Sequence, residues 1–379
     1  MSRLALVALA GLSTSVGIYA AAAMALVRMR RTTRGNPSPA ATPAVSILKP
    51  LCGLDDGLEQ NLESFFRLDY PEYEVVFSFA ADTDPAYPIA RRVADRHPSV
   101  PSTFVFDARD GGGNAKIDRL AAGLARARHR MVLTSDGNVR VRPDFLGRAV
   151  SHFAQSGVGV VSHLFLASGA VTLASRVESL YLNGCLQPGT TALSGLLKLP
   201  CVVGKSILIS RTALEAIGGF PSLENYLAED YLIGRAVRQA GYGVVLSADV
   251  IETREVGKSP GVAFARHRRW AMMRHQLAGP LYLCEVFSGP LPWALVLGAA
   301  GAWPAAGVLL GARYAMEGFV AAKLGARLRL ADWFLLPVRD LAAAGVFLAG
   351  LVGGPISWRG RALRIGRDTR IVRPAPSES

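Results

Sequence analysis

The sequence predicts an α/β protein, in which a doubly wound, mostly parallel sheet forms one domain and transmembrane helices flank it on the N-terminal and C-terminal sides. Three observations predict this fold class. Short runs of β-branched and aromatic residues alternate with segments of helical period between residues 45 and 135. Residues 4–27 carry no charge, and the composition becomes apolar again from residue 281. In all, 50% of the residues are hydrophobic and the mean hydropathy is +0.27, which is high for a soluble protein.

The N-terminal segment has the features of a membrane anchor. Residues 4–27 are long enough to cross a bilayer, and Arg28, Arg30, Arg31 and Arg34 follow at once. Because positive charge marks the cytoplasmic side of a span, everything after residue 28 is expected in the cytoplasm. A cleaved signal peptide is the alternative, but the apolar stretch is too long for one and the stronger basic cluster lies after it.

Residues 35–44 (GNPSPAATPA) are rich in proline and small residues, which is typical of a linker. After them, strand-like and helix-like runs alternate, with a triple-glycine loop at 111–113. This βαβ repetition implies a mostly parallel sheet with helices on both faces. The expected elements, in chain order, are a strand at 45–48, a helix at 58–66, a strand at 74–80, a helix near 86–97, a strand at 103–106, a helix near 116–128 and a strand that ends at Ser135.

The second half of this domain has a weaker pattern. A strand is expected at 157–162, and the pattern weakens over 163–200. The apolar stretch at 186–209 predicts either a segment on the membrane surface or a buried core segment. A helix that starts at 228–230 and closes at Gly241, followed by a strand at 243–247, completes the domain.

The C-terminal part contains two apolar stretches. Residues 281–312 are nearly uncharged but interrupted by prolines, so they predict either one span with an interfacial lead-in or a tight two-span hairpin. Residues 333–354 form a second candidate span. Arg339 and Asp340 inside it are expected to pair or to face protein, because a charge that faces lipid is costly. The number of C-terminal crossings stays open.

These segments give an expected domain organisation. The four cysteines have no CxxC or Cys/His spacing, which is typical of reduced thiols and fits a cytoplasmic domain. The expected parts are the N-terminal transmembrane anchor with its basic flank (1–34), the linker (35–44), the cytoplasmic α/β domain (45–280), the C-terminal membrane region (281–358) and a basic tail (359–379).

The formal net charge is +13, and its distribution points to a membrane rather than to nucleic acid. Four arginines at 28–34 and six at 359–373, offset by Asp368, carry most of the excess. Both clusters flank apolar segments, where anionic lipid attracts basic side chains. The expected partners therefore include the lipid bilayer and exclude nucleic acid.

Acidic residues follow the predicted strands. Asp82, Asp84 and Asp136 fall just after the carboxyl end of a strand, and ligands of open parallel sheets bind beyond these ends. Asp136 and Asn138 supply a carboxylate and an amide oxygen, which suit Mg²⁺ or Mn²⁺. A divalent metal held there would stabilise the negative charge on a departing sugar-linked diphosphate. The sequence thus indicates a site for a nucleotide sugar at this edge of the sheet.

Further polar residues lie near the same edge. Capping explains one of Asp82 and Asp84, and the pair together predicts a nucleotide contact in which a carboxylate accepts from the base or the ribose. Asn114 and Lys116 follow the triple glycine and add an amide and a cation within reach of base or phosphate. A solvated helix start is the alternative interpretation of these two residues.

Two later motifs supply a base and cations. Glu229-Asp230 lies at a helix start, where the macrodipole favours an ionised carboxylate, so Asp230 is the candidate general base for an acceptor hydroxyl. The run 266–270 (RHRRW) contains Arg266, Arg269 and Trp270, of which the guanidinium groups suit a diphosphate and the indole suits a sugar ring. A juxtamembrane basic cluster is the alternative for this run.

Taken together, these motifs resemble those of family 2-type glycosyltransferases with a GT-A fold, and specifically the ceramide glucosyltransferase family. The resemblance covers roughly residues 45–290 and the flanking spans. It rests on the following segments: Leu48-Lys-Pro-Leu-Cys-Gly53, Asn61-Leu-Glu-Ser-Phe-Phe66, Leu68-Asp-Tyr-Pro71, Asp84-Pro-Ala86, Asn114-Ala-Lys116, Ser135-Asp136, Cys201-Val-Val-Gly204, Gly218-Gly219, Ala228-Glu-Asp-Tyr231 and Arg266 to Trp270.

The resemblance implies roles for individual residues. Asp84 becomes the nucleotide-side acid, Asp136 the metal-associated acid and Asp230 the base. The (Q/R)xxRW motif of the family falls on Arg266, Arg269 and Trp270. The family also implies UDP-glucose as donor, ceramide as acceptor and a single inverting displacement.

Two departures bear on the acceptor. Asp118 stands where many family members have Asn, and Gln187-Pro188 stands where animal members have His-Pro. A similar pattern occurs in bacterial enzymes that glycosylate hopanoids from UDP-N-acetylglucosamine, which is therefore one alternative. A processive polysaccharide synthase and a non-enzymatic nucleotide-sugar sensor are the others. The expectation is a multi-pass protein of the cell inner (plasma) membrane, with a cytoplasmic catalytic domain that transfers hexose from a UDP-sugar to a membrane lipid.

Overall fold

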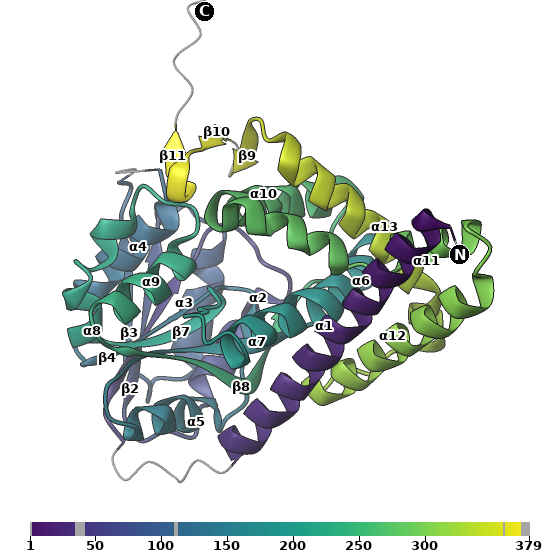
Figure 1. Cartoon of the computed structure of the whole chain (residues 1–379). Helices are drawn as coiled ribbons and strands as arrows, with labels where there is room; N and C mark the ends of the chain where they lie inside the picture. The colour runs from purple at the N-terminus through teal and green to yellow at the C-terminus, as the bar shows by residue number, and fades with distance from the viewer. Residues whose placement is uncertain (1, 35–41, 110–112, 359–360, 373–379) are drawn as a thin grey trace, which may run out of the picture. The chain divides into compact units, whose positions relative to one another are not determined.

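The computed structural model describes residues 2–34, 42–109, 113–358 and 361–372 (Figure 1). Contacts divide the chain into two compact units, and each is described by itself. Most of the predicted triple-glycine loop and most of the linker lie outside the described residues. The helical unit comprises Met1–Arg28, Leu166–Leu197 and Glu255–Ser379, and the sheet unit comprises Met29–Phe165 and Lys198–Arg254.

Four parallel strands form the first half of the sheet, as the βαβ pattern predicts. Every residue of β2 (Tyr73–Phe79) is buried, which explains why its sequence shows no alternation of polar and apolar residues. In the register, Ile47 of β1 lies opposite Val75 of β2 and Leu133 of β4. The four neighbours, in spatial order, are β3 (Ser102–Phe106), β2, β1 (Val45–Pro50) and β4 (Met131–Ser135).

The second half makes the eight-stranded sheet mixed. β7 (Ser206–Ser210) pairs antiparallel with both β4 and β6 (Val158–Ser168), and β8 (Gly243–Arg254) pairs antiparallel with β5 (Val139–Arg140). Of the two interpretations offered for the stretch 186–209, its C-terminal end follows the second, because β7 is a buried core strand. Exposed leucines lie further upstream in this stretch, at positions 193, 196, 197 and 199.

Helices of the sheet unit flank these strands. α4 ends at Leu124, earlier than the predicted residue 128. The reason is a carboxylate on β2: Glu74 accepts a hydrogen bond at 2.7 Å from the backbone N of Arg128 and one at 2.8 Å from its Nε. The helices are α2 (Leu58–Phe66), α3 (Ala86–Arg96), α4 (Ala115–Leu124), α5 (Phe145–Ser151), α8 (Arg211–Ala216) and α9 (Glu229–Gln239).

The helical unit contains regular structure that the sequence pattern missed. Over 163–200, where the sequence pattern is weak, α6 (Leu173–Tyr181), a π-helical turn (Leu182–Leu186) and α7 (Gln187–Gly195) follow one another. A capping box between Thr172 and Ser175 starts α6, and its serine at the third position hides the usual Glu or Gln signature.

Among the residues that the structure describes, two helices are long and apolar enough to cross a membrane by length and composition. They are α1 (Arg3–Arg34), over Arg3–Thr32, and α13 (Leu330–Val352). The helices α10 (Pro260–Ala278, with a 3₁₀ continuation to Phe287) and α11 (Leu291–Ala299) meet at a 50° bend and form a third candidate, either a broken span or a re-entrant loop.

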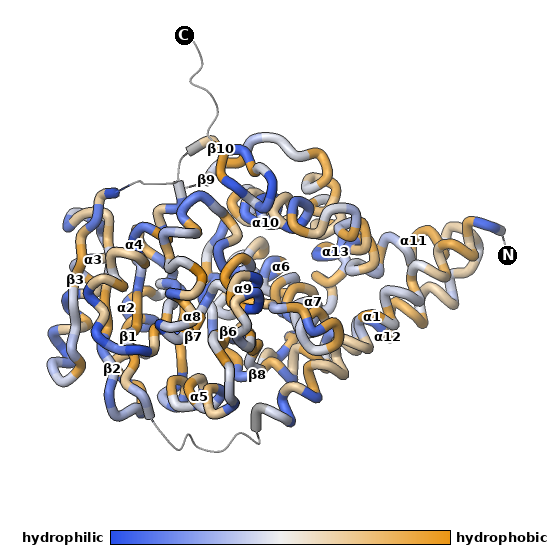
Figure 2. The backbone as a smooth tube through the Cα atoms, turned by 60° about the vertical axis from the view of Figure 1, so that its left-hand side comes forward, coloured by the Kyte–Doolittle hydropathy of each residue, from blue (hydrophilic) through white to orange (hydrophobic). Residues whose placement is uncertain are grey.

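α12 (Trp303–Leu324) lies beside α1 in both views (Figure 1, Figure 2). Small residues make this close approach possible, since Ala5 and Ala8 of α1 pack in one cluster with Ala306 of α12 and Leu297 of α11. The basic tail forms a small antiparallel sheet within its described residues, with β9 (Ile356–Trp358), β10 (Arg361–Ile365) and β11 (Ile371–Val372).

The charges inside α13 pair within the protein, which confirms the prediction for Arg339 and Asp340. Both side chains are 0% exposed. Two nitrogens of Arg339 donate to the two oxygens of Glu317 on α12, at 2.8 Å each, and its Nε donates to Asp340 at 2.9 Å. Arg313 adds a second cation on Glu317, and Tyr314 donates its hydroxyl to Asp340 at 2.9 Å. The network is charge-balanced.

Candidate active site

Asp136 lies just past the carboxyl end of β4 and is the centre of an ionic cluster in the sheet unit. Its Oδ1 is 3.0 Å from Nζ of Lys116, and its Oδ2 is 3.2 Å from Nζ of Lys205. The two ammonium groups hold the pKa of Asp136 at about 2, although removal from water alone would raise it. This carboxylate is therefore ionised at every physiological pH.

Asp136 and Asn138, the predicted metal ligands, converge on one cation. Nζ of Lys205 lies 3.2 Å from Oδ2 of Asp136 and 3.2 Å from Oδ1 of Asn138. Two hard oxygen donors that already share a positive charge suit Mg²⁺ or Mn²⁺. The described residues contain no group of three or more His, Cys, Asp and Glu that could hold a metal.

Lys116 links this cluster to the start of α9. Its Nζ lies 3.1 Å from Oε1 of Glu229 and donates to the carbonyl of Gly204 at 3.2 Å. The neighbouring Asn114 is fully buried, caps α4 by accepting from the backbone N of Lys116, and donates to the carbonyl of Tyr226 at 2.7 Å. Asn114 thus holds the chain that presents Lys116, and its amide is already hydrogen-bonded within the protein.

Asp230 stands at the same cluster, on the first turn of α9. Its Oδ2 accepts from the backbone N of Gly204 at 2.9 Å, and its Oδ1 accepts from the N of Tyr231 at 2.8 Å. Removal from water, with the adjacent Glu229 second, raises the pKa of Asp230 to about 6, against the opposing charge of Lys116. Burial thus outweighs the helix dipole, which alone would lower this pKa. A carboxyl with this pKa is mostly ionised at neutral pH and accepts a proton readily.

Asp84 and Asp82 occupy different environments. Asp84 accepts from the backbone N of Gly53 at 3.0 Å and from the N of Ala86 at 2.9 Å, so it ties the loop after β1 to the start of α3. Asp82 is exposed, and within the described part of the chain no hydrogen bond or ion pair is found for it. Of these two carboxylates, Asp82 is the more accessible to a ligand.

Lys49 supports the loop after β4 that carries Asp136. The sequence analysis did not select it as a site residue. Its side chain is 0% exposed. Its Nζ donates to Oγ of Ser135 and to the carbonyl of Asp136, at 3.1 Å each, and lies 3.4 Å from the centre of the Phe65 ring. Burial lowers its pKa well below the usual value. The signal was a lysine inside an otherwise apolar strand.

Asn61, which was also not selected as a site residue, holds the backbone of the same loop at Gly137. Its fully buried amide donates to the carbonyls of Gly137 at 3.2 Å and Asp56 at 3.0 Å, and its Oδ1 accepts from Nε of Arg140 at 3.3 Å. The backbone between Asp136 and Asn138 is therefore fixed by a side chain from α2. Such a buried amide in an amphipathic helix carries no distinctive sequence signal.

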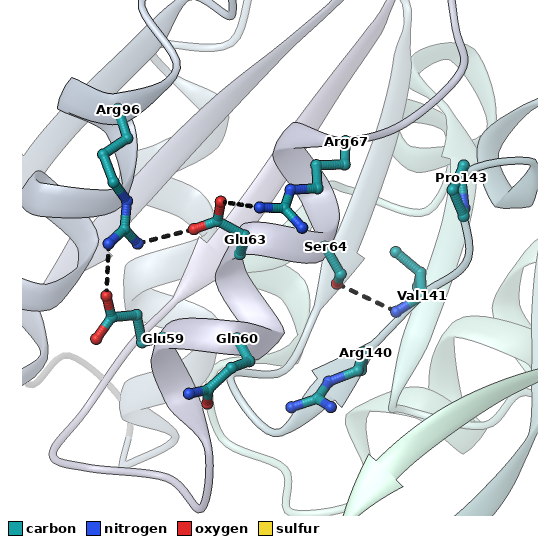
Figure 3. A pocket seen from close by; sticks show the side chains of 9 residues that line it. All are labelled: Glu59, Gln60, Glu63, Ser64, Arg67, Arg96, Arg140, Val141 and Pro143. Carbon is teal, nitrogen blue, oxygen red and sulfur yellow. Dashed lines mark hydrogen bonds and ion pairs between the residues drawn. The ribbon is translucent and has the colours of Figure 1, made fainter.

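Arg140 also lines a cavity of about 650 Å³ in the sheet unit (Figure 3). Arg96 pairs there with Glu59 and Glu63, at 2.8 Å each, and Arg67 pairs with Glu63 at 2.9 Å. Most of the positive charge in this cavity is thus neutralised by the protein. None of the predicted site residues lines it.

In the helical unit, Arg266, Arg269 and Trp270 share one face of α10, three and four residues apart. Arg266 donates to two buried carboxylates, Glu178 of α6 and Glu255, at 3.1–3.2 Å for Glu255, and its guanidinium lies 5.1 Å from the Trp270 ring. Arg266 therefore anchors α10 to its neighbours, while Arg269 and Trp270 are partly exposed. Neither Glu178 nor Glu255 could be assigned to Arg266 from the sequence, because neither belongs to the 266–270 run.

We expect Glu178→Ala to destabilise the protein by about 3 kcal/mol, because it leaves the buried Arg266 with one carboxylate fewer. Thermal denaturation of the purified protein in detergent measures this loss of stability. Asp95→Ala is the matched control, since its pair with Arg91 is exposed and worth less than about 1 kcal/mol. Equal losses in both variants would contradict a stabilising role for Glu178.

Comparisons with known proteins support the family resemblance found in the sequence. Ceramide glucosyltransferase 1 and Ceramide glucosyltransferase 3 of Caenorhabditis elegans are each 27% identical to this chain, over 244 and 257 residues. The matches cover 64% and 67% of this chain but 52% and 56% of the relatives, so the chain spans about half the length of these relatives.

A solved structure of a mannosyltransferase from Pyrobaculum calidifontis, in complex with GDP-Man and Mn²⁺, has a TM-score of 0.53 at 22% identity. The match covers 91% of this chain and 99% of the other. This likeness bears on the fold and agrees with the expected GT-A fold. The profile of Glycosyl transferase family 21 matches residues 12–371, which is nearly the whole sequence. The chain belongs to Glycosyl transferase family 21.

Proposed function

We propose that this protein is a membrane-anchored glycosyltransferase that transfers hexose, with inversion, from UDP-glucose to the hydroxyl of a ceramide-like membrane lipid. One observation carries the proposal: Lys116 bridges the Asp136 carboxylate to Glu229, the residue before the candidate base Asp230. The carboxylate proposed to hold the metal, two cations and the candidate base thus lie at one edge of the sheet unit. The family and the two nematode relatives support the lipid acceptor.

In this mechanism Asp230 accepts the proton of the acceptor hydroxyl as its oxygen attacks the anomeric carbon opposite the UDP. The bond from that carbon to the β-phosphate oxygen breaks, and UDP leaves. Lys116 and Lys205 stabilise the negative charge that develops on the diphosphate. Asp136 and Asn138 would hold Mg²⁺ or Mn²⁺, which supplies further charge neutralisation when bound.

The remaining predicted residues have supporting roles in the proposal. Asp82 offers its exposed carboxylate to the base or ribose, and Asp84 keeps the loop after β1 in place beside it. Arg269 and Trp270 keep their predicted role as donor contacts, and Arg266 fixes their helix through Glu178 and Glu255. A cytoplasmic catalytic domain on the inner membrane, with the domain boundaries predicted above, belongs to the same proposal.

The test of the function is an assay of the purified protein with UDP-glucose and UDP-N-acetylglucosamine, offered ceramide and a hopanoid polyol, with products resolved by mass. Glucosylceramide is the expected product. The departure at Gln187-Pro188 keeps the hopanoid glycosyltransferase as the second candidate, and N-acetylglucosaminyl hopanoid as the product would establish it. Polymer formation would instead indicate a processive synthase, and no release of UDP with any lipid would indicate a sensor.

Gly204→Ala is expected to reduce turnover about 100-fold, because an added Cβ would lie 2.8 Å from Oδ2 of Asp230 and displace the base. Steady-state kinetics with unchanged thermal stability would show this effect. Gly147→Ala on α5 is the control, since its Cβ meets nothing within 4 Å and its turnover should equal that of the unmodified protein. Full turnover by Gly204→Ala would remove the Gly204–Asp230 contact from the mechanism.

A further inference from the structure

The cavity of about 650 Å³ in the sheet unit has more cationic than anionic side chains on its walls (Figure 3). Two carboxylates, Glu59 and Glu63, line it together with three guanidinium groups, those of Arg67, Arg96 and Arg140. The charges of the lining residues therefore sum to one positive charge. A cavity of this volume has the size that holds a small metabolite.

Arg140 is the cation of this cavity that the lining carboxylates do not neutralise. Arg96 pairs with both of these carboxylates, at 2.8 Å each, and Arg67 pairs with Glu63 at 2.9 Å. Arg140 instead donates through its Nε to the neutral Oδ1 of Asn61 at 3.3 Å, and among the residues that the structure describes it forms no ion pair. Its terminal nitrogens, Nη1 and Nη2, are thus the donors that the cavity presents to an anion.

The geometry of this guanidinium suits an oxyanion. Two parallel N–H groups at the end of an arginine match two oxygens of a carboxylate or a phosphate. A Cβ added to Gly57 would lie 3.5 Å from Nη2 of Arg140 and 3.4 Å from Oε1 of Gln60, so these two side chains converge, as Figure 3 also shows. The exposed amide of Gln60 can therefore supply a further donor beside the guanidinium.

Asn61 connects this guanidinium to the loop after β4. Its amide nitrogen donates to the carbonyl of Gly137 at 3.2 Å, between Asp136 and Asn138, while its Oδ1 accepts from Arg140. Arg140 itself follows Asn138 by two residues, on β5. An anion that restrains the guanidinium thus also restrains Asn61 and, through it, the backbone between the two candidate metal ligands.

We propose that this cavity binds the oxyanion group of a small metabolite, a phosphate or a carboxylate, at the terminal nitrogens of Arg140. It is an effector site, because none of the predicted site residues lines it and its occupancy orders the loop that carries Asp136 and Asn138. A bound oxyanion therefore strengthens UDP binding, and UDP strengthens oxyanion binding by the same factor. This coupling rests on the proposed function, whereas the oxyanion site does not.

The test is calorimetric titration of the full-length protein in detergent with inorganic phosphate and, separately, with acetate, at constant ionic strength and with saturating UDP. UDP occupies the cations beside Asp136, so an oxyanion that still binds lies elsewhere. Arg140→Met should weaken the binding of the oxyanion about tenfold or more, because it removes a charge-assisted pair. Arg142→Met is the matched control: this exposed arginine pairs with Asp144 at 3.1 Å, and its loss should leave binding unchanged.

Gln60→Glu gives a second test that keeps Arg140 and changes only an exposed side chain. The new carboxylate would pair with Arg140 and repel the oxyanion, so binding should fall by a similar factor. No binding of phosphate or acetate by the unmodified protein would overturn the inference, and so would full binding by Arg140→Met or Gln60→Glu.

Two further measurements separate this site from the candidate active site. Lys116→Met, titrated without UDP, should still bind the oxyanion, and loss of that binding would place the anion beside Asp136 and overturn the inference. UDP affinity should rise about fivefold when the oxyanion is present, in the unmodified protein but not in Arg140→Met. Unchanged or weaker UDP binding would overturn the effector role. Glycosyl transfer is assayed separately, so oxyanion binding that depends on Arg140 without any transfer would reject the proposed function and keep the site.

Discussion

Asp230→Asn is expected to bind UDP normally and to lose transfer by about 10³-fold, which is the usual contribution of a general base. The amide keeps the size of the side chain, and its oxygen can still accept from the backbone N of Gly204. It cannot accept the proton of the acceptor hydroxyl. The measurement is turnover with lipid acceptor, beside UDP affinity determined by calorimetry. Near-normal turnover would remove Asp230 from the mechanism.

The pH dependence gives the same residue a second test. Because the pKa of Asp230 is raised to about 6, kcat/KM should fall below pH 6 as the base becomes protonated, and Asp230→Asn should lack this limb. The raised pKa has the opposite effect on stability, which falls as the pH rises. A carboxyl whose folded pKa exceeds its unfolded value of about 4 stabilises the fold below pH 4, and that contribution is lost as the pH rises through 6. At pH 7–8 Asp230→Asn should therefore have a higher Tm than the unmodified protein.

A change at the neighbouring residue tests whether its negative charge helps to set the pKa of Asp230. Glu229→Gln removes the neighbouring carboxylate that helps to raise the pKa of Asp230 and also frees one partner of Lys116. The acid limb of kcat/KM should then move to lower pH while turnover at neutral pH persists. A limb that stays at pH 6 in this variant would assign it to another group.

The sequence predicts those parts of the fold that rest on local pattern. The parallel strands β1 to β4 and their helices show buried runs and helical period, and α1 shows as an uncharged stretch. The same alternation places Asp136 at a strand end, where the structure finds it. β7 was not predicted because its sequence, SILIS, continues an apolar stretch, and its pairing with β4 and β6 identifies it.

The residues of the candidate site also divide into those with a local sequence signal and those without one. Asp136, Asn138, Lys116 and Asp230 were selected from strand ends and a helix start, and the sheet unit brings them together; their roles stay predictions. Lys205 reaches the cluster through long-range antiparallel pairing, for which one sequence holds no signal. Lys49 and Asn61 act by burial, and burial of a polar residue is visible only once its partners are known.

Within the candidate spans, the largest expected effect belongs to Arg339. Arg339→Met should destabilise the protein by about 3–5 kcal/mol, because it leaves Asp340 without a cation inside α13 and takes one of two cations from Glu317. Such charges are costly away from water, and in the variant Asp340 would still accept from the hydroxyl of Tyr314 and the backbone N of Leu291, which carry no charge. Thermal unfolding in detergent and the yield of membrane-inserted protein measure the loss.

Charge balance predicts which second change restores stability. Arg339→Met combined with Asp340→Asn removes one charge of each sign and leaves Arg313 paired with Glu317, so the double variant should regain much of the lost stability. Arg327→Met, at an exposed position, should change stability by less than about 0.5 kcal/mol. If the double variant were as unstable as Arg339→Met, packing of the arginine side chain rather than charge pairing would hold α12 against α13.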